Sequence, residues 1–185
     1  MNQLPNIISM FRILLVMPVV WALLNLEYAA ALVLFAIAGF TDALEGFLAK
    51  HYHWESRLGS ILDPLADKLL LVSSFLVLAW IELIPLWLVV VVIIRDLLIV
   101  IGGVVFHYMF VQFDMAPSRI SKANTFFQII FVLAVVFHHG EFAFTPWEVE
   151  ALGHIVLVTT VISGIDYVWV WGKRAINTSK QQNIP

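Results

Sequence analysis

Two pairs of acidic residues in one stretch of this chain have the spacing of a metal site or an acid–base site. Asp42 and Glu45 lie three positions apart, and Asp63 and Asp67 lie four positions apart. Residues at these spacings share one face of a helix. Only about eight residues separate the two segments, and helices with so short a connection are usually antiparallel neighbours. We therefore expect the two acidic faces to meet, with four carboxylates in one small volume.

Small residues extend both acidic faces. Gly46 and Ala49 continue the face of the first pair, and Gly59 precedes the second pair by one helical turn. Pro64 is the only residue of the second segment that argues against an uninterrupted helix. Each predicted helix therefore presents acids beside small residues.

Four carboxylates in an apolar setting need a cation, because unpaired carboxylates repel one another and are costly to remove from water. Two divalent ions would balance the four charges, and an all-oxygen ligand set favours Mg²⁺ or Mn²⁺ over zinc or copper. The alternative is a set of buried salt bridges. Its candidate cations are Lys50, Arg57, Lys68 and Arg95. We expect metal, because acids are in ordered excess on both faces.

The composition is that of an integral membrane protein. Of the 185 residues, 62% are hydrophobic and 12% are charged, and the mean hydropathy is +0.95. Six apolar segments predict an all-α protein with six transmembrane helices, in a single domain over residues 1–185 with a cytoplasmic tail at 171–185. The expected spans are residues 7–26, 29–50, 58–80, 86–110, 120–138 and 150–171. No basic stripe suggests binding to nucleic acid.

The positions of Lys and Arg predict the orientation of the spans. If the N-terminus is cytoplasmic, the cations between and after the spans lie at the cytoplasmic face. They are Lys50, Arg57, Arg119, Lys122, Lys173, Arg174 and Lys180. The opposite loops, around Glu27, Glu82 and residues 141–148, contain acids and no Lys or Arg. Both termini and the loop between the acidic segments should therefore be cytoplasmic.

Several charges fall inside the expected spans, where each should face the bundle interior or a wet cavity. They are Arg12, Lys68, Arg95, Asp96 and Asp166. For Arg95 and Asp96, a salt bridge is an open alternative. In the polar segment at residues 117–128, Arg119 and Lys122 would either contact phosphates at the mouth of a cavity or lie solvated at the interface.

The spacing D-x2-E-G-x2-A-K-x8-G-x3-D-x3-D, from Asp42 to Asp67, resembles the signature of the CDP-alcohol phosphotransferases. In that family the pattern is usually D-x2-D-G-x2-A-R-x8-G-x3-D-x3-D. This chain departs from it at Glu45, which adds a methylene, and at Lys50, which lacks the bidentate fork of arginine. The resemblance covers most of the chain.

The resemblance implies a six-span homodimer that uses divalent metal to transfer a phosphatidyl or related group from a CDP-linked donor to an alcohol, with release of CMP. Its metal ligands would be Asp42, Glu45, Asp63 and Asp67. Asp67 would also be the base that activates the acceptor hydroxyl. The donor nucleotide or phosphates would be bound by Asn6, Asp42, Gly46, Ala49, Lys50 and Gly59. The acceptor phosphate would be bound by Arg95, Arg119 and Lys122.

The acceptor is predicted less directly. The opening LPNIISMFRILL is similar to both the phosphatidylglycerophosphate synthases and the cardiolipin synthases of the family, whereas LGSILDPLADKLL and SRISKANTFFQ are closer to the cardiolipin synthases. We therefore expect CDP-diacylglycerol as donor and phosphatidylglycerol as acceptor, with glycerol 3-phosphate as the alternative. We expect the active site to face the cytoplasm at a bacterial inner membrane. A non-catalytic family member acting as a partner subunit is the alternative of another class.

Overall fold

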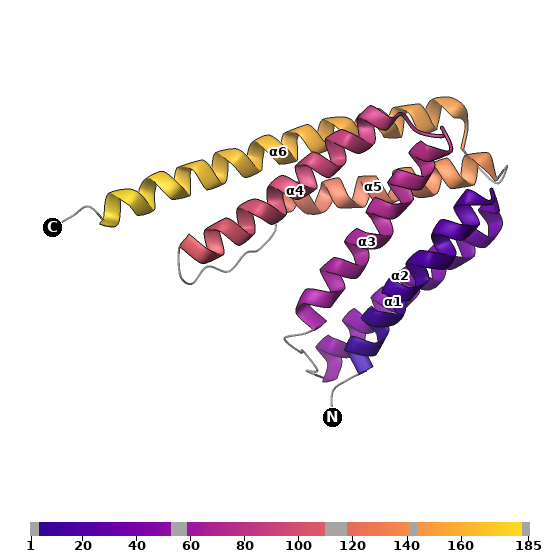
Figure 1. Ribbon diagram of the computed structural model, residues 1–185, viewed down its shortest axis with the longest axis horizontal. Coiled ribbons are helices and arrows are strands. Elements are labelled where there is room, and N and C mark those ends of the chain that lie inside the picture. Colours follow the sequence, from indigo (N-terminus) through magenta and orange to yellow (C-terminus); the bar gives the residue numbers. More distant parts are fainter. Residues whose placement is uncertain (1–3, 53–58, 110–117, 141–143, 183–185) are drawn as a thin grey trace. The chain divides into compact units, whose positions relative to one another are not determined.

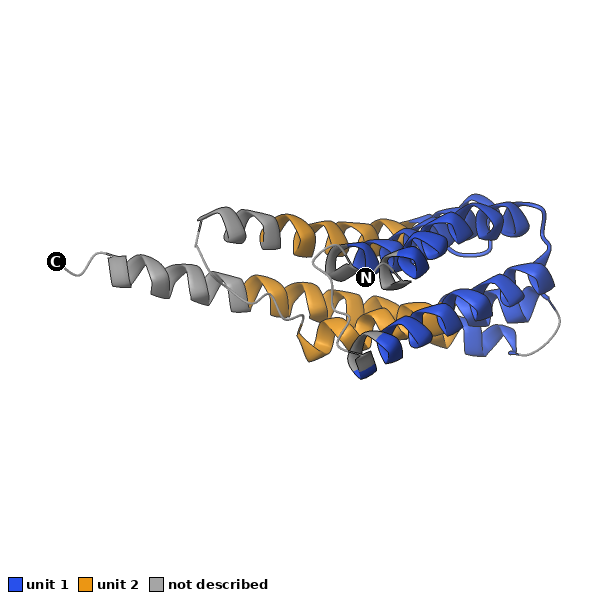
Figure 2. Ribbon diagram, turned by 90° about the horizontal axis from the view of Figure 1, so that it is seen from below, with its two compact units in different colours: residues 1–86, 132–149 blue, residues 87–131, 150–185 orange. Residues whose placement is uncertain are grey.

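The computed structural model of the chain has six helices and no strand in the residues that it describes, which are 4–52, 59–109, 118–140 and 144–182 (Figure 1). Side chains are described for residues 7–48, 51, 62–102, 118–140 and 144–169. The chain divides into two compact units, which Figure 2 colours blue and orange. Unit 1 comprises Met1–Leu86 and Val132–Val149, and unit 2 comprises Trp87–Phe131 and Glu150–Pro185. The prediction of an all-α protein is confirmed.

Unit 1 is built around its first helix. Helix α1 (Leu4–Leu24) packs against both α2 (Tyr28–Tyr52) and α3 (Gly59–Trp80). Val19 and Leu23 of α1 are fully buried, as are Ala31 of α2 and Phe75 of α3. The expected meeting of the acidic faces of α2 and α3 is present, and it takes place against α1, which packs on both helices. Pro64 lies inside α3 without ending it.

Tight backbone turns end α1 and α3. Leu26 has φ 59° and Glu82 has φ 62°, both in the left-handed region that usually favours glycine. The amide of Glu27 donates to the Ala22 carbonyl over 2.9 Å, and the amide of Leu83 donates to the Leu78 carbonyl over 2.9 Å. This is the Schellman arrangement, in which the last carbonyls of a helix accept hydrogen bonds from the residues that follow it. Each turn ends its helix within a few residues.

Unit 2 contains most of α4 (Leu86–Met109) and α6 (Pro146–Gln182) and the first part of α5 (Arg119–His139). Thr145 precedes α6, and its amide donates to Glu148 Oε2 over 2.7 Å while the amide of Glu148 donates to the Thr145 carbonyl over 3.1 Å. The Glu148 carboxylate thus caps the free amide before the first turn, which is the acidic half of a capping box. This cap begins α6 four residues before the expected sixth span. The same helix continues to Gln182, past the expected end of the span at Trp171.

Alongside its buried apolar core, this protein exposes many large apolar side chains and buries several polar ones, unlike a water-soluble domain. Large apolar side chains point outward, with Met17 74% exposed and Leu14 68% exposed, whereas Arg12 and Ser9 are buried. In the described residues, four helices are long and apolar enough to cross a membrane, namely α1, α2, α5 and α6. Apolar outer faces of this length suit lipid as the surrounding solvent. The expected six spans and their orientation remain predictions.

Candidate active site

Arg12 lies at the centre of a cluster of acidic side chains in unit 1. Its Nη2 is 2.9 Å from Asp42 Oδ1 and 3.0 Å from Glu45 Oε2, and its Nη1 is 2.7 Å from Asp67 Oδ1. The Arg12 side chain is only 1% exposed. One guanidinium therefore joins α1 to acids on both α2 and α3.

Ser9 joins the remaining acid to the cluster. Ser9 lies one turn before Arg12, so both side chains leave the same face of α1. Its hydroxyl contacts Glu45 Oε1 at 2.8 Å and also contacts Asp63 Oδ1. Glu45 is 3% exposed, and its two oxygens are thus held by Ser9 and Arg12. No pattern in the sequence selects Ser9, because a single serine in an apolar segment resembles any other serine.

The four acids predicted from the sequence are thus gathered by the first helix. Two of them open outward, because the side chains of Asp42 and Asp67 are 55% and 53% exposed. Asp63 is half-buried and Glu45 is buried. The cluster has an inner side, which is hydrogen-bonded by α1, and an outer side, which is accessible.

The cation among these acids is Arg12, which was expected to face the bundle interior or a wet cavity but was not among the salt-bridge candidates. The salt-bridge alternative named Lys50, Arg57, Lys68 and Arg95, whereas the structure inserts Arg12. As they stand around Arg12, no three acid or histidine side chains in the described residues converge closely enough to hold a metal ion. The donor set itself, four carboxylates, has the chemistry that Mg²⁺ and Mn²⁺ prefer. The residues fit such an ion in chemistry, while the guanidinium lies where the ligands would converge.

The predicted donor-binding residues are described only in part. Gly46 lies on α2 beside Glu45, and a Cβ built on it would meet nothing within 4 Å. The space next to the acids is therefore open at this position. The side chains of Asn6, Ala49, Lys50 and Gly59 lie outside the described residues, so their predicted roles remain predictions.

Unit 2 has a second buried polar cluster, centred on Arg95 of α4. Arg95 Nη1 is 2.7 Å from Asp96 Oδ1, and its Nη2 donates to the Ser121 hydroxyl over 2.6 Å. Its Nε donates to Ser163 Oγ over 3.1 Å, and Nη2 also contacts that oxygen. The guanidinium, 4% exposed as a residue, thereby joins α4, α5 and α6. The salt bridge between Arg95 and Asp96 that the sequence left open is present.

The other two predicted acceptor-binding residues do not join Arg95 in this structure. Arg119 begins α5 and Lys122 lies one turn later, and both side chains are exposed. The side chain of this segment that contacts Arg95 is Ser121. The hydroxyls and amides of residues 117–128 thus contribute to an interior cluster, and its two cations face outward.

Two amide side chains continue this cluster along α5. Asn124 Oδ1 accepts hydrogen bonds from the hydroxyls of Thr159 and Thr160, each over 2.9 Å. Asn124 Nδ2 and both polar atoms of Gln128 are buried without a hydrogen-bond partner among the described residues. Buried amides are usually paired with protein or with water. The interior of unit 2 therefore has hydrogen-bonding capacity left over.

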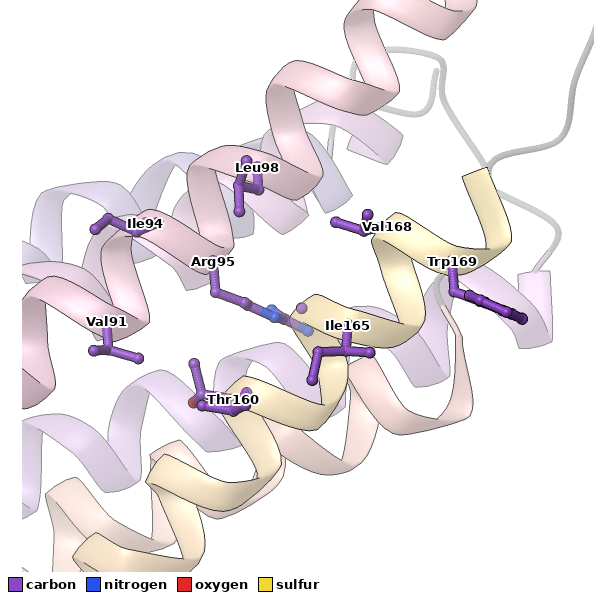
Figure 3. Close-up of a pocket in the computed structure, with 10 residues that line it drawn as sticks. Val91, Ile94, Arg95, Leu98, Thr160, Ile165, Val168 and Trp169 are labelled. Carbon is purple, nitrogen blue, oxygen red and sulfur yellow. The ribbon is translucent and has the colours of Figure 1, made fainter. Parts of the chain in front are cut away.

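An open cavity of about 730 Å³ lies between α4 and α6 within unit 2. Figure 3 shows the Arg95 side chain reaching from α4 toward α6 at this cavity. Most of the other lining side chains are apolar, and Thr160 is polar. The lining residues are Val91, Ile94, Arg95, Leu98, Thr160, Val161, Gly164, Ile165, Val168 and Trp169. Its volume is in the range of sites for small organic ligands. The arrangement combines apolar walls with one buried cation.

Residues 2–166 match the CDP-alcohol phosphatidyltransferase family. The chain belongs to this family. The match spans both units and includes every acid of the unit 1 cluster. Proteins of the CDP-alcohol phosphatidyltransferase family generally use divalent metal ions, in keeping with the carboxylate donor set.

Curated relatives within the family have two different names. The chain is 30% identical to the cardiolipin synthase (CMP-forming) of Rattus norvegicus, over 96% of this chain and 64% of that protein. It is 31% identical to the CDP-diacylglycerol--glycerol-3-phosphate 3-phosphatidyltransferase of Bacillus subtilis, over 90% of this chain and 94% of that protein. A cardiolipin synthase (CMP-forming) of Streptomyces coelicolor is 38% identical over 54% of this chain and 50% of its own length. The chain thus spans less than two thirds of the rat relative.

Proposed function

We propose that this protein transfers a phosphatidyl group from CDP-diacylglycerol to a hydroxyl of phosphatidylglycerol, forming cardiolipin and releasing CMP. Membership of the CDP-alcohol phosphatidyltransferase family supports the reaction class. The near-equal identity to relatives of both names, 30% and 31%, does not separate a lipid acceptor from glycerol 3-phosphate. The apolar cavity beside Arg95 is the observation that favours the lipid acceptor.

Asp67 is the proposed general base. Its side chain is half-exposed, so an acceptor hydroxyl can reach it. In the proposed reaction the acceptor oxygen bonds to the phosphorus that carries the diacylglycerol, and the bond from that phosphorus to the CMP oxygen breaks. CMP leaves with the electron pair, and the hydroxyl proton passes to the Asp67 carboxylate.

The proposed metal ligands are the four acids of the unit 1 cluster. Asp42, Glu45, Asp63 and Asp67 would hold two divalent ions, Mg²⁺ or Mn²⁺, which neutralise phosphate charge when bound. Glu45 is the buried member of the set, and its contacts with Ser9 and Arg12 fix its orientation. The donor diphosphate would lie at the accessible side, where Asp42 and Asp67 are exposed.

The proposed acceptor site is the cavity of unit 2. A phosphatidylglycerol molecule has an anionic phosphate and apolar chains, whereas glycerol 3-phosphate has no apolar part. The buried guanidinium of Arg95 suits the phosphate, and the walls formed by residues such as Leu98 and Val161 suit an acyl chain. Arg119 and Lys122, exposed at the start of α5, would contribute positive charge where the lipid headgroup enters.

The acceptor assignment is tested by filling the cavity. Leu98 lines it and is 47% exposed, whereas its neighbour Leu97 is 52% exposed and does not line it. We expect Leu98→Trp to raise the KM for phosphatidylglycerol by about tenfold, as for a misfitting apolar contact, with the KM for CDP-diacylglycerol unchanged. Leu97→Trp is the matched control and should leave both values unchanged. Equal acceptor KM values in the two variants would remove the support for a lipid acceptor and favour glycerol 3-phosphate.

The proposed setting is a homodimer in a bacterial inner membrane, with the active site on the cytoplasmic face. The distribution of Lys and Arg supports the orientation. The resemblance to the CDP-alcohol phosphotransferases suggested the homodimer.

A further inference from the structure

Arg12 occupies the place that a divalent ion would be expected to take among the acids of unit 1. It contacts three of the four expected metal ligands, Asp42, Glu45 and Asp67, at 2.7 to 3.0 Å. These contacts come from two different helices. An ion binding to the same carboxylates would have to share them with the guanidinium.

The contacts of Arg12 are incomplete. Its Nε is buried and has no hydrogen-bond partner among the described residues, although its two terminal nitrogens are engaged. An arginine whose only role is to stabilise the fold normally has hydrogen-bond partners for all its buried donors, because an unpaired buried N–H is costly. By contrast, the Nε of Arg95, the second buried arginine among the described side chains, donates to Ser163 over 3.1 Å. The unpaired Nε shows that this arrangement leaves Arg12 short of one partner.

The charge of the cluster also indicates that Arg12 alone does not complete the site. Three acids contact the guanidinium and a fourth joins them through Ser9, so acids outnumber the cation within this cluster. Two of the acids that Arg12 contacts are half-exposed and can be reached from outside. The cluster therefore still attracts cations while Arg12 holds its ligands in place.

We infer that Arg12 is the internal counter-cation of the metal-free site, and that it competes with the divalent ion for Asp42 and Asp67. In this role it is a positioning residue. It keeps mutually repelling carboxylates together before metal arrives, and it weakens metal affinity because its contacts must be given up. The inference rests on the metal-ligand part of the proposed function and not on the identity of the acceptor.

The test measures the affinity of the purified protein for Mn²⁺. Electron paramagnetic resonance monitors the binding, with neither donor nor acceptor present. Removing one positive charge within a few ångströms of the ion should strengthen its binding, so we expect Arg12→Gln to bind Mn²⁺ at least about tenfold more tightly than the unaltered protein. Arg12→Lys retains the charge but cannot bridge acids on two helices in the same way, so its affinity should be intermediate. Glu148→Gln, in the exposed cap of α6 and outside both clusters, should leave the affinity unchanged.

Thermal unfolding supplies the second readout. Arg12→Gln should have a lower Tm than the unaltered protein without metal, and Mn²⁺ should raise its Tm more. Purification of the folded variant only when Mn²⁺ is present would also support the inference. Unchanged or weaker Mn²⁺ affinity in Arg12→Gln and Arg12→Lys would overturn it, as would failure of both to fold with and without Mn²⁺. Because no CMP release is measured, an inactive protein that still shows tighter binding would contradict the proposed reaction alone.

Discussion

At the scale of single residues, the site depends on side chains that α1 contributes. Ser9 and Arg12 connect all four predicted acids, although neither belongs to the acidic segments themselves. Glu45 illustrates the dependence, since it is the buried acid and both of its oxygens are held from α1. A buried carboxylate is tolerated only when it is paired in this way.

Ser9→Ala should destabilise the protein because it removes a hydrogen-bond partner from the buried Glu45 carboxylate. We expect a loss of about 1–3 kcal/mol in the free energy of unfolding, the usual cost of an unsatisfied buried polar group. Ser73→Ala is the matched control, because Ser73 Oγ donates only to the Leu70 carbonyl in its own helix, over 3.0 Å. Reversible unfolding in mixed detergent measures both. Equal stability of the two variants would contradict the importance of the Ser9 contact.

The four acids could be found from the sequence because their spacing is helical and their charge is unusual in an apolar chain. Arg12 could be recognised as a buried charge for the same reason, but its partners could not, since they lie on other helices. Ser9 could not be found, because nothing distinguishes it from a serine that bonds to its own helix. Arg119 and Lys122 attracted attention by charge, whereas Ser121 makes the contact with Arg95.

At the scale of elements, α4 and α6 approach closely where Gly102 faces Tyr167. A Cβ on Gly102 would lie 2.9 Å from Tyr167 Cζ and still closer to the hydroxyl oxygen. That hydroxyl donates to the Ile99 carbonyl over 3.1 Å, which fixes the ring against α4. The apolar pattern predicted helices here, and Gly102 with Gly103 allows close helix contact, but nothing in the sequence identified Tyr167 as the partner.

Gly102→Ala should destabilise unit 2, because the added methyl group would overlap the Tyr167 ring. Overpacking of this kind costs about 1–3 kcal/mol. Gly39→Ala in α2 is the control, because a Cβ there meets nothing within 4 Å and should be neutral or slightly stabilising. Unfolding of both variants under identical conditions provides the measurement. Restored stability in the double variant Gly102→Ala, Tyr167→Leu would identify the ring as the cause, whereas a stable Gly102→Ala would rule out the close contact.

Helix ends were predicted less well than helix positions. Leu26 and Glu82 adopt positive φ at the ends of α1 and α3, and neither residue signals such a turn. The end of α6 was placed by the loss of hydrophobicity at Trp171, but a helix can continue into polar sequence, and this one runs to Gln182. Hydrophobicity marks where lipid ends, and backbone hydrogen bonding decides where a helix ends.

At the scale of the whole molecule, the proposed reaction requires a membrane and a fixed orientation of the protein in it. Apolar outer faces and buried polar clusters occur in both units. The family match runs across both units, from residue 2 to residue 166. The single domain over residues 1–185, the six spans and the cytoplasmic termini stay predictions from the sequence.

The orientation can be tested with single cysteines, because the chain has none of its own. Six spans place Glu27 and Ser118 on opposite sides of the membrane. In bacterial cells with a permeable outer membrane and an intact inner membrane, an impermeant maleimide should label Glu27→Cys. It should label Ser118→Cys only after the inner membrane is opened. Labelling of both in intact cells, or of Ser118→Cys alone, would contradict the predicted topology.

The central claim is that unit 1 catalyses phosphatidyl transfer, and CMP release tests it most directly. Purified protein in lipid would be given CDP-diacylglycerol, Mn²⁺ and either phosphatidylglycerol or glycerol 3-phosphate, alongside Asp67→Asn. Glu148→Gln, in the exposed cap of α6, is the matched acid-to-amide control. We predict CMP release with phosphatidylglycerol by the unaltered protein and by Glu148→Gln, and a rate at least about 100-fold lower for Asp67→Asn, as for loss of a general base. CMP release with glycerol 3-phosphate alone would change the acceptor assignment from phosphatidylglycerol to glycerol 3-phosphate. If neither acceptor supports CMP release above the rate of Asp67→Asn, the result would contradict catalysis and favour a non-catalytic partner subunit.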